Sequence, residues 1–125
     1  MKFYIKIILL LLSFNVYADW VSISKTSNKE FLIEKDSHER VDNSTIRSWV
    51  LVNYKNETEF GVKSTASFTE FDCANKSYQD IVTIYYDDHD RKGNVLIEDR
   101  SVNDVTFAAP DSNAMILLNH SCTLI

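Results

Sequence analysis

Residues 45–54, TIRSWVLVNY, are the stretch that decides the fold. β-Branched and aromatic side chains recur through it with the two-residue period that is typical of a strand. One face carries Ile46, Val50, Val52 and Tyr54, and the other carries Trp49 and Leu51. Apolar side chains on both faces predict a central strand that is covered on two sides.

Five further segments share this strand-like composition and are separated by short polar turns. They span residues 20–24, 30–35, 60–73, 78–86 and 94–98. Within the segment 60–73, Phe68 and Phe71 break the two-residue period, which predicts a β-bulge there. Six short strands that follow one another through short turns predict an antiparallel meander.

The C-terminal residues change to a helical period. Ala109-Pro110-Asp111-Ser112 is the predicted helix start, with the proline in the first turn and the acid at the positive end of the dipole. Met115, Leu118 and Cys122 recur at spacings of three and four, so they share the face that packs on the core. The predicted fold class is α+β, a six-stranded antiparallel sheet with a C-terminal helix on one face.

Residues 1–18 have the form of an export signal. They contain a short basic head, an apolar run over residues 7–14, and the ending Val16-Tyr17-Ala18 that a signal peptidase recognises. The apolar run is too short to span a bilayer, so an uncleaved anchor fits less well. We expect cleavage before Asp19, a single domain over residues 19–125, and no transmembrane segment in the mature chain.

The charge balance limits the kinds of partner. The whole chain has a net charge of −5, and without Lys2 and Lys6 of the leader it keeps 11 basic and 18 acidic groups, a net charge of −7. Nucleic acids and anionic lipids require basic surfaces, so neither is an expected partner.

Cys73 and Cys122 are the only cysteines. In an oxidising compartment an even pair of cysteines favours a disulfide. Here the disulfide would close a loop of about 50 residues, and this restriction of the unfolded chain would raise the free energy of unfolding by about 4 kcal/mol. The alternatives are a nucleophilic cysteine, which needs a neighbouring base, and a zinc site, which needs more ligands. A disulfide between these cysteines would attach the C-terminal helix to one face of the sheet.

Several short motifs occur in an order similar to that of the surface-adhesin protein E family. They are Trp20, the Asp42-Asn43 turn, the strand 50–53, Cys73-Ala74-Asn75, Tyr86-Asp87, Gly93, and Pro110-Asp111 before a helix that ends in Cys122. The resemblance covers nearly all of residues 19–125. It implies a six-stranded antiparallel sheet whose helix is tied to the concave face by the disulfide, and a place in the periplasm or on the outer surface of a Gram-negative bacterium.

The resemblance also implies a binding role, because the best-known member is an adhesin for vitronectin, laminin and plasminogen. This sequence departs from that adhesin in two respects. Its leader lacks the lipid-bearing cysteine, which favours a free periplasmic location, and its segment 78–93 is acidic where the adhesin is basic. We expect an exported, non-enzymatic domain that binds a host matrix protein or an envelope protein. The alternative is a periplasmic inhibitor of a hydrolase such as lysozyme, with residues 55–59 or 87–92 as a protruding plug.

Residues 87–93, DDHDRKG, form the densest polar cluster. A calcium loop that begins at Asp88 would place Asp90 at the third position, but Lys92 would then occupy a ligand position. A hairpin turn explains the cluster better. We therefore predict no metal site, with Asp88 and Asp90 as the only metal candidates, and no cofactor.

No catalytic arrangement is visible in the sequence. His38, His89 and His120 lack ligand-like spacing, no nucleophile lies on a strand–turn–helix elbow, and no glycine-rich loop could hold phosphate. An enzyme is expected only if the histidines or the acidic turn converge in space. Trp49, Tyr85 and Tyr86 are the aromatic candidates for a binding surface, but the sequence does not identify the residues that bind.

Overall fold

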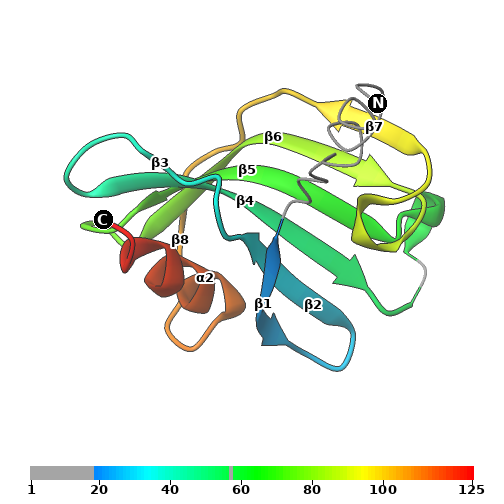
Figure 1. Cartoon of the computed structure of the whole chain (residues 1–125), viewed down its shortest axis with the longest axis horizontal. Coiled ribbons are helices and arrows are strands. Elements are labelled where there is room, and N and C mark those ends of the chain that lie inside the picture. The colour runs from blue at the N-terminus through cyan, green and yellow to red at the C-terminus, as the bar shows by residue number, and fades with distance from the viewer. Residues whose placement is uncertain (1–18, 57) are drawn as a thin grey trace, which may run out of the picture.

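The computed structural model describes residues 19–56 and 58–125, so the predicted leader lies outside the described residues. Figure 1 shows an antiparallel sheet with a helix against one of its faces. The elements are β1 (Trp20–Lys25), β2 (Lys29–Glu34), β3 (Glu39–Arg40), β4 (Thr45–Tyr54), η2 (Glu59–Gly61), β5 (Ser64–Asp72), β6 (Ser77–Tyr86), η3 (His89–Arg91), β7 (Val95–Asp99), β8 (Thr106–Phe107) and α2 (Asn113–Cys122).

The strand order is β1-β2-β4-β5-β6-β7, with every neighbouring pair antiparallel. The two-residue strands β3 and β8 lie beside β4 and β6. This topology confirms the predicted α+β class and the six-stranded meander. The two short strands were not predicted, because two residues are too few to produce a periodic pattern.

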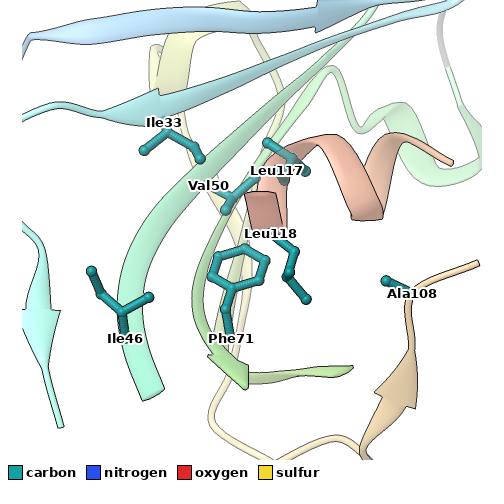
Figure 2. Close-up of a cluster of buried hydrophobic side chains, with 7 residues drawn as sticks. All are labelled: Ile33, Ile46, Val50, Phe71, Ala108, Leu117 and Leu118. Carbon is teal, nitrogen blue, oxygen red and sulfur yellow. The ribbon is translucent and has the colours of Figure 1, made fainter. Parts of the chain in front are cut away.

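The main core lies between the sheet and α2. Figure 2 shows the helix residues Leu117 and Leu118 directed toward Val50 and Phe71 of the sheet. Ile33, Ile46 and Ala108 complete this buried cluster. Burying such side chains is the main term that stabilises a domain of this size, at about 25 cal/mol for each Å² of apolar surface removed from water.

The opposite face of the sheet also carries buried apolar residues. Leu51 of β4 is 1% exposed, and it lies in register with Leu32 of β2 and Ala66 of β5, which are also buried. The prediction that β4 is a central strand with both faces covered is therefore confirmed.

The predicted start of the helix is wrong by three residues. α2 begins at Asn113, and the Ser112 hydroxyl accepts a hydrogen bond from the Met115 N–H at 3.1 Å as the N-cap. Pro110 and Asp111 precede this cap, and Asp111 has a φ of +61°, outside the helical range. The first turn therefore contains neither the proline nor the acid. The predicted packing of Leu118 toward the core is confirmed, and Met115 and Cys122 pack against the same cluster.

The bulge predicted in the segment 60–73 lies in the neighbouring strand instead. Phe68 pairs with Val82 and Thr69 pairs with Asp80, so the extra residue is Ile81 of β6. Phe68 and Phe71 broke the apparent period because residues three apart in a regular strand lie on opposite faces. Phe71 is buried in the core beneath α2, and Phe68 packs on Trp49 on the other face, with 5.2 Å between ring centroids.

The strand β5 also begins later than predicted. Its predicted first residue, Phe60, belongs to the η2 turn and has a φ of +64°, while Gly61 has a φ of +70°. These left-handed conformations are incompatible with a strand. Regular pairing with β4 begins only at Ser64.

Candidate functional site

The two cysteines are bonded to each other, as the sequence predicts. The sulfur atoms of Cys73 and Cys122 are 2.03 Å apart, and the bond joins the residue after β5 to the last residue of α2. Neither sulfur is therefore a free nucleophile or a metal ligand. The role of the pair is structural.

The acidic turn 87–93 is folded back onto the sheet. The Asp90 carboxylate accepts a hydrogen bond from the Asn53 amide at 2.8 Å, and Ser64 donates its hydroxyl proton to the Asp88 carbonyl. The Arg91 guanidinium lies 4.7 Å from the centroid of the Trp20 ring. Both metal candidates therefore serve internal contacts: Asp88 caps η3 through the His89 N–H, and Asp90 binds β4.

This arrangement also bears on the inhibitor alternative. Residues 88–91 lie against the ends of β4 and β5 instead of protruding as a plug. The other candidate plug, residues 55–59, includes residue 57, which lies outside the described residues. The inhibitor function stays a prediction without a specific contact in its favour.

Two of the three histidines come close together, which no sequence spacing indicated. His38 Nδ1 lies 2.7 Å from the Ser48 hydroxyl oxygen, and burial, followed by the nearby His120, lowers the pKa of His38. Ser48 is completely buried, whereas His38 is partly exposed. His89 lies apart, with Nε2 2.8 Å from the Tyr54 carbonyl oxygen. In residues 19–56 and 58–125, no three His, Cys, Asp or Glu side chains are grouped as a metal site.

The aromatic candidates are mostly engaged within the sheet. Trp49 packs on Phe68, while Tyr85 and Tyr86 pair with Ile97 and Val95 of β7. All three candidates are partly buried. Tyr85 and Tyr86 therefore lie beside β7, whereas Trp49 lies on β4, with β5 and β6 between it and β7.

The apolar surface of the molecule is concentrated in one segment. Eleven large apolar side chains are exposed in the described parts of the chain, and six of them fall between residues 95 and 107. These six are Val95, Leu96, Ile97, Val102, Val105 and Phe107. Phe107 is 74% exposed, although aromatic side chains normally contribute to a core. A concentration of exposed apolar side chains is typical of an interaction surface.

The first three of these residues lie on an edge of the sheet. β7 pairs only with β6 among the described strands, so one side of its backbone is left without a strand partner. A bulge at Leu96 pairs Val95 with Tyr86 and Ile97 with Tyr85, so these two apolar side chains project on opposite faces of this edge. The opposite edge, β1, carries only Val21 as an exposed large aliphatic residue. The β7 edge is therefore the more apolar of the two.

Acidic groups border this edge. Glu98 pairs with Arg100 at 2.7 Å. The Asp99 carboxylate accepts a hydrogen bond from the Ser101 N–H at 2.9 Å, and the contacts with Ser101 lower the pKa of Asp99. Asp99 is therefore ionised near neutral pH, and the edge combines aliphatic side chains with negative charge. We call residues 95–107 the edge segment.

The edge segment was missed in the sequence. Residues 94–98 were correctly predicted as a strand, but periodicity does not distinguish an exposed apolar strand from a buried one. The available signal was the run of Val95, Leu96 and Ile97, in which no polar side chain alternates, followed by isolated apolar residues in a polar sequence.

Comparison with known proteins identifies the family. Among the described residues, none of the helices has the length and apolar character needed to cross a membrane. No curated protein and no solved structure matches the chain. The family model described as surface-adhesin protein E matches residues 20–123, which include the whole sheet, the helix and the disulfide. The chain therefore belongs to the surface-adhesin protein E family.

Proposed function

We propose that this chain is an exported, non-enzymatic adhesin-like domain that binds an extended segment of a protein partner along the free edge of β7. The observation that carries the proposal is the edge segment, where exposed aliphatic side chains coincide with an unpaired strand edge. A peptide that adds to such an edge gains main-chain hydrogen bonds, and its alternate side chains gain apolar contacts.

The chemistry of the edge specifies the partner further. Aliphatic side chains on both faces of β7 fit a partner strand that is itself aliphatic. The ionised Asp99 and the exposed Asp104 fit basic residues in that strand. A host matrix protein or an envelope protein with an exposed basic and aliphatic segment meets both requirements. Family membership supports a protein ligand of this kind.

The test compares two charge-introducing variants. In Leu96→Lys/Ile97→Lys, charged side chains replace the apolar edge, which should weaken partner binding at least tenfold. Val21→Lys is the control, because it places a lysine on an exposed aliphatic position of the opposite edge strand. Surface positions such as these change stability by only about 0.5 kcal/mol, so both variants should fold.

Binding is measured by biolayer interferometry against immobilised vitronectin, laminin and plasminogen, and against a detergent extract of the bacterial envelope. Lysozyme serves as the ligand for the inhibitor alternative, with a turbidity assay for its activity. Equal binding by the two variants would overturn the role of β7. Binding to lysozyme alone, with protection of cell walls, would support the inhibitor function instead.

The cellular location is tested separately. We propose that residues 1–18 are removed on export, and that the domain reaches the periplasm or the outer surface. Protease treatment of intact cells, followed by treatment after the outer membrane is opened, distinguishes these two places. Digestion on intact cells supports a host ligand, whereas protection until opening supports a partner in the envelope.

A further inference from the structure

A groove between α2 and the sheet lies apart from β7 and serves no purpose described above. Its volume is about 160 Å³, and it is lined by β2, β4, β5, β6 and α2. The apolar part of the wall consists of Phe31, Val50, Val52, Phe71, Tyr78, Ala114 and Leu117. A cavity of roughly 150 Å³ can hold a benzene-sized group, so this groove has room for one side chain and not for a larger ligand.

One end of the groove is polar. The Asp80 carboxylate accepts a hydrogen bond from the Thr69 hydroxyl at 2.7 Å, and the Ser67 and Thr83 hydroxyl oxygens are 3.1 Å apart. Asp80, Thr69 and Ser67 all line the groove. Three oxygen-bearing side chains thus line an otherwise apolar wall.

The bulge in β6 accounts for this grouping. In a regular strand, residues 80 and 83 would lie on opposite faces, because they are an odd number of residues apart. The extra residue Ile81 restores them to the same face, so that Asp80 faces Thr69 and Thr83 faces Ser67. Bulges commonly redirect a side chain in this way next to a functional site.

Asp80 has no cationic partner in the part of the chain that the structure describes. The ion pairs found there join other residues, and the only side chain that hydrogen-bonds to the Asp80 carboxylate there is that of Thr69. Asp80 is partly buried at an apolar wall, where a carboxylate loses hydration without gaining an opposite charge. A cation that enters the groove would supply that charge.

We propose that this groove receives a lysine side chain of a protein partner, with the ammonium group at Asp80 and the methylene stem along the apolar wall. An ammonium group is a compact charge with three donors, which matches the oxygens of Asp80, Thr69 and Ser67. An arginine guanidinium prefers both oxygens of one carboxylate, and here one Asp80 oxygen also accepts the Thr69 hydrogen bond, which competes with that pairing. This site goes beyond the edge-strand proposal and does not depend on it.

The experiment uses the isolated full domain and small probes, so it does not require the partner. Nα-acetyl-lysine methylamide is titrated into ¹⁵N-labelled protein, alongside the norleucine and arginine derivatives. We expect the lysine derivative to shift the amide resonances of Thr69, Asp80 and Leu117 in a saturable manner. The norleucine derivative has nearly the same stem without the charge, and should bind at least tenfold more weakly.

The matched variants are Asp80→Asn and Asp19→Asn. Asparagine at position 80 can still accept the Thr69 hydrogen bond, so the fold should be kept while lysine affinity falls at least tenfold. Asp19 is exposed and lies outside both the groove and the edge segment, and its variant should bind lysine as the unchanged protein does. Equal binding of lysine and norleucine by the unchanged protein, or no saturable shift, would overturn the proposal even if Asp80→Asn failed to fold. Leu96→Lys/Ile97→Lys should leave the lysine shifts unchanged, which separates this site from β7.

Discussion

The disulfide joins Cys73 and Cys122, which are 49 residues apart in the sequence, and their Cα atoms lie 5.9 Å apart. The bond ties the last residue of α2 to the end of β5. At the other end of the helix, the Ser24 hydroxyl donates to the Asn113 side-chain oxygen at 2.7 Å, which connects α2 to β1. The helix is therefore attached at both ends, and the buried Leu118 packs between these attachments.

Removing the disulfide tests how much this covalent bond contributes to the stability of the fold. We expect the double variant Cys73→Ser/Cys122→Ser to lose about 2–5 kcal/mol of unfolding free energy, because the cross-link restricts a long loop in the unfolded chain. Urea denaturation followed by circular dichroism measures the loss. When a reductant is added, the unfolding free energy of the unchanged protein should fall toward that of the variant. A urea midpoint that is the same with and without the reductant would contradict the prediction.

Packing beneath the helix is tested by a second pair of variants. Leu118 is completely buried, so Leu118→Ala should cost about 2–5 kcal/mol of stability through lost burial and the cavity left behind. Ile116 lies on the same helix but is 41% exposed, and Ile116→Ala should cost less than about 1 kcal/mol. Equal losses in the two variants, measured by urea denaturation, would mean that the helix does not pack through Leu118.

Strong periodicity made the strands predictable. Residues 45–54 were predicted as a strand with the bounds that the structure shows, because apolar side chains mark both faces. The disulfide was also predictable, since a chain with two cysteines has one possible internal pairing. The helix start was misplaced because Pro110 and Asp111 are typical of a first turn, yet the chain uses the Ser112 hydroxyl as the cap.

The candidate sites were much less predictable, because they depend on register and exposure. The bulge at Ile81 brings Asp80 beside Thr69, and no local pattern reveals which of two paired strands carries an extra residue. The proximity of His38 to Ser48 and His120 likewise arises only when separate elements meet. The acidic turn was predicted as a hairpin turn between two strands, as the structure shows, but its contacts with Asn53 and Ser64 depend on the register of β4 and β5.

Gly93 provides a test of the turn between β6 and β7. Its φ is +76°, and a Cβ atom at this position would meet the Asp87 carboxylate. That carboxylate accepts hydrogen bonds from the Asn94 backbone at 2.7 Å and its side chain at 3.2 Å, and these bonds lower the pKa of Asp87. Gly93→Ala should therefore reduce stability by about 1–3 kcal/mol through backbone strain and displacement of the carboxylate.

The neighbouring residue Lys92 is the control for this turn. It is exposed and has a φ of −86°, so Lys92→Ala should change stability by no more than about 0.5 kcal/mol. Thermal unfolding followed by circular dichroism compares the two variants. Similar melting temperatures for Gly93→Ala and the unchanged protein would show that the turn tolerates a side chain at residue 93.

His38 should make stability depend on pH. Burial first, and then the nearby His120, lower the pKa of His38 from its ordinary value of 6.5, while the Lys35 carbonyl, Asp36 and Glu34 act in the opposite direction. The folded state therefore binds fewer protons at His38 than the unfolded chain does. This contribution to stability is fully present above pH 6.5 and decreases as the pH falls from 6.5 toward the lower pKa of the folded state.

The variant His38→Gln isolates this effect, because glutamine can still hydrogen-bond to the Ser48 hydroxyl but does not titrate. The unfolding free energy is measured by urea denaturation at about pH 7.5 and about pH 5.5, on either side of the ordinary histidine value. We expect the unchanged protein to lose more stability on acidification than His38→Gln does. His89→Gln is the control for histidine replacement in general, because His89 lies at the η3 turn, away from Ser48. Parallel losses in the unchanged protein and His38→Gln would show that His38 does not hold its neutral form in the folded state.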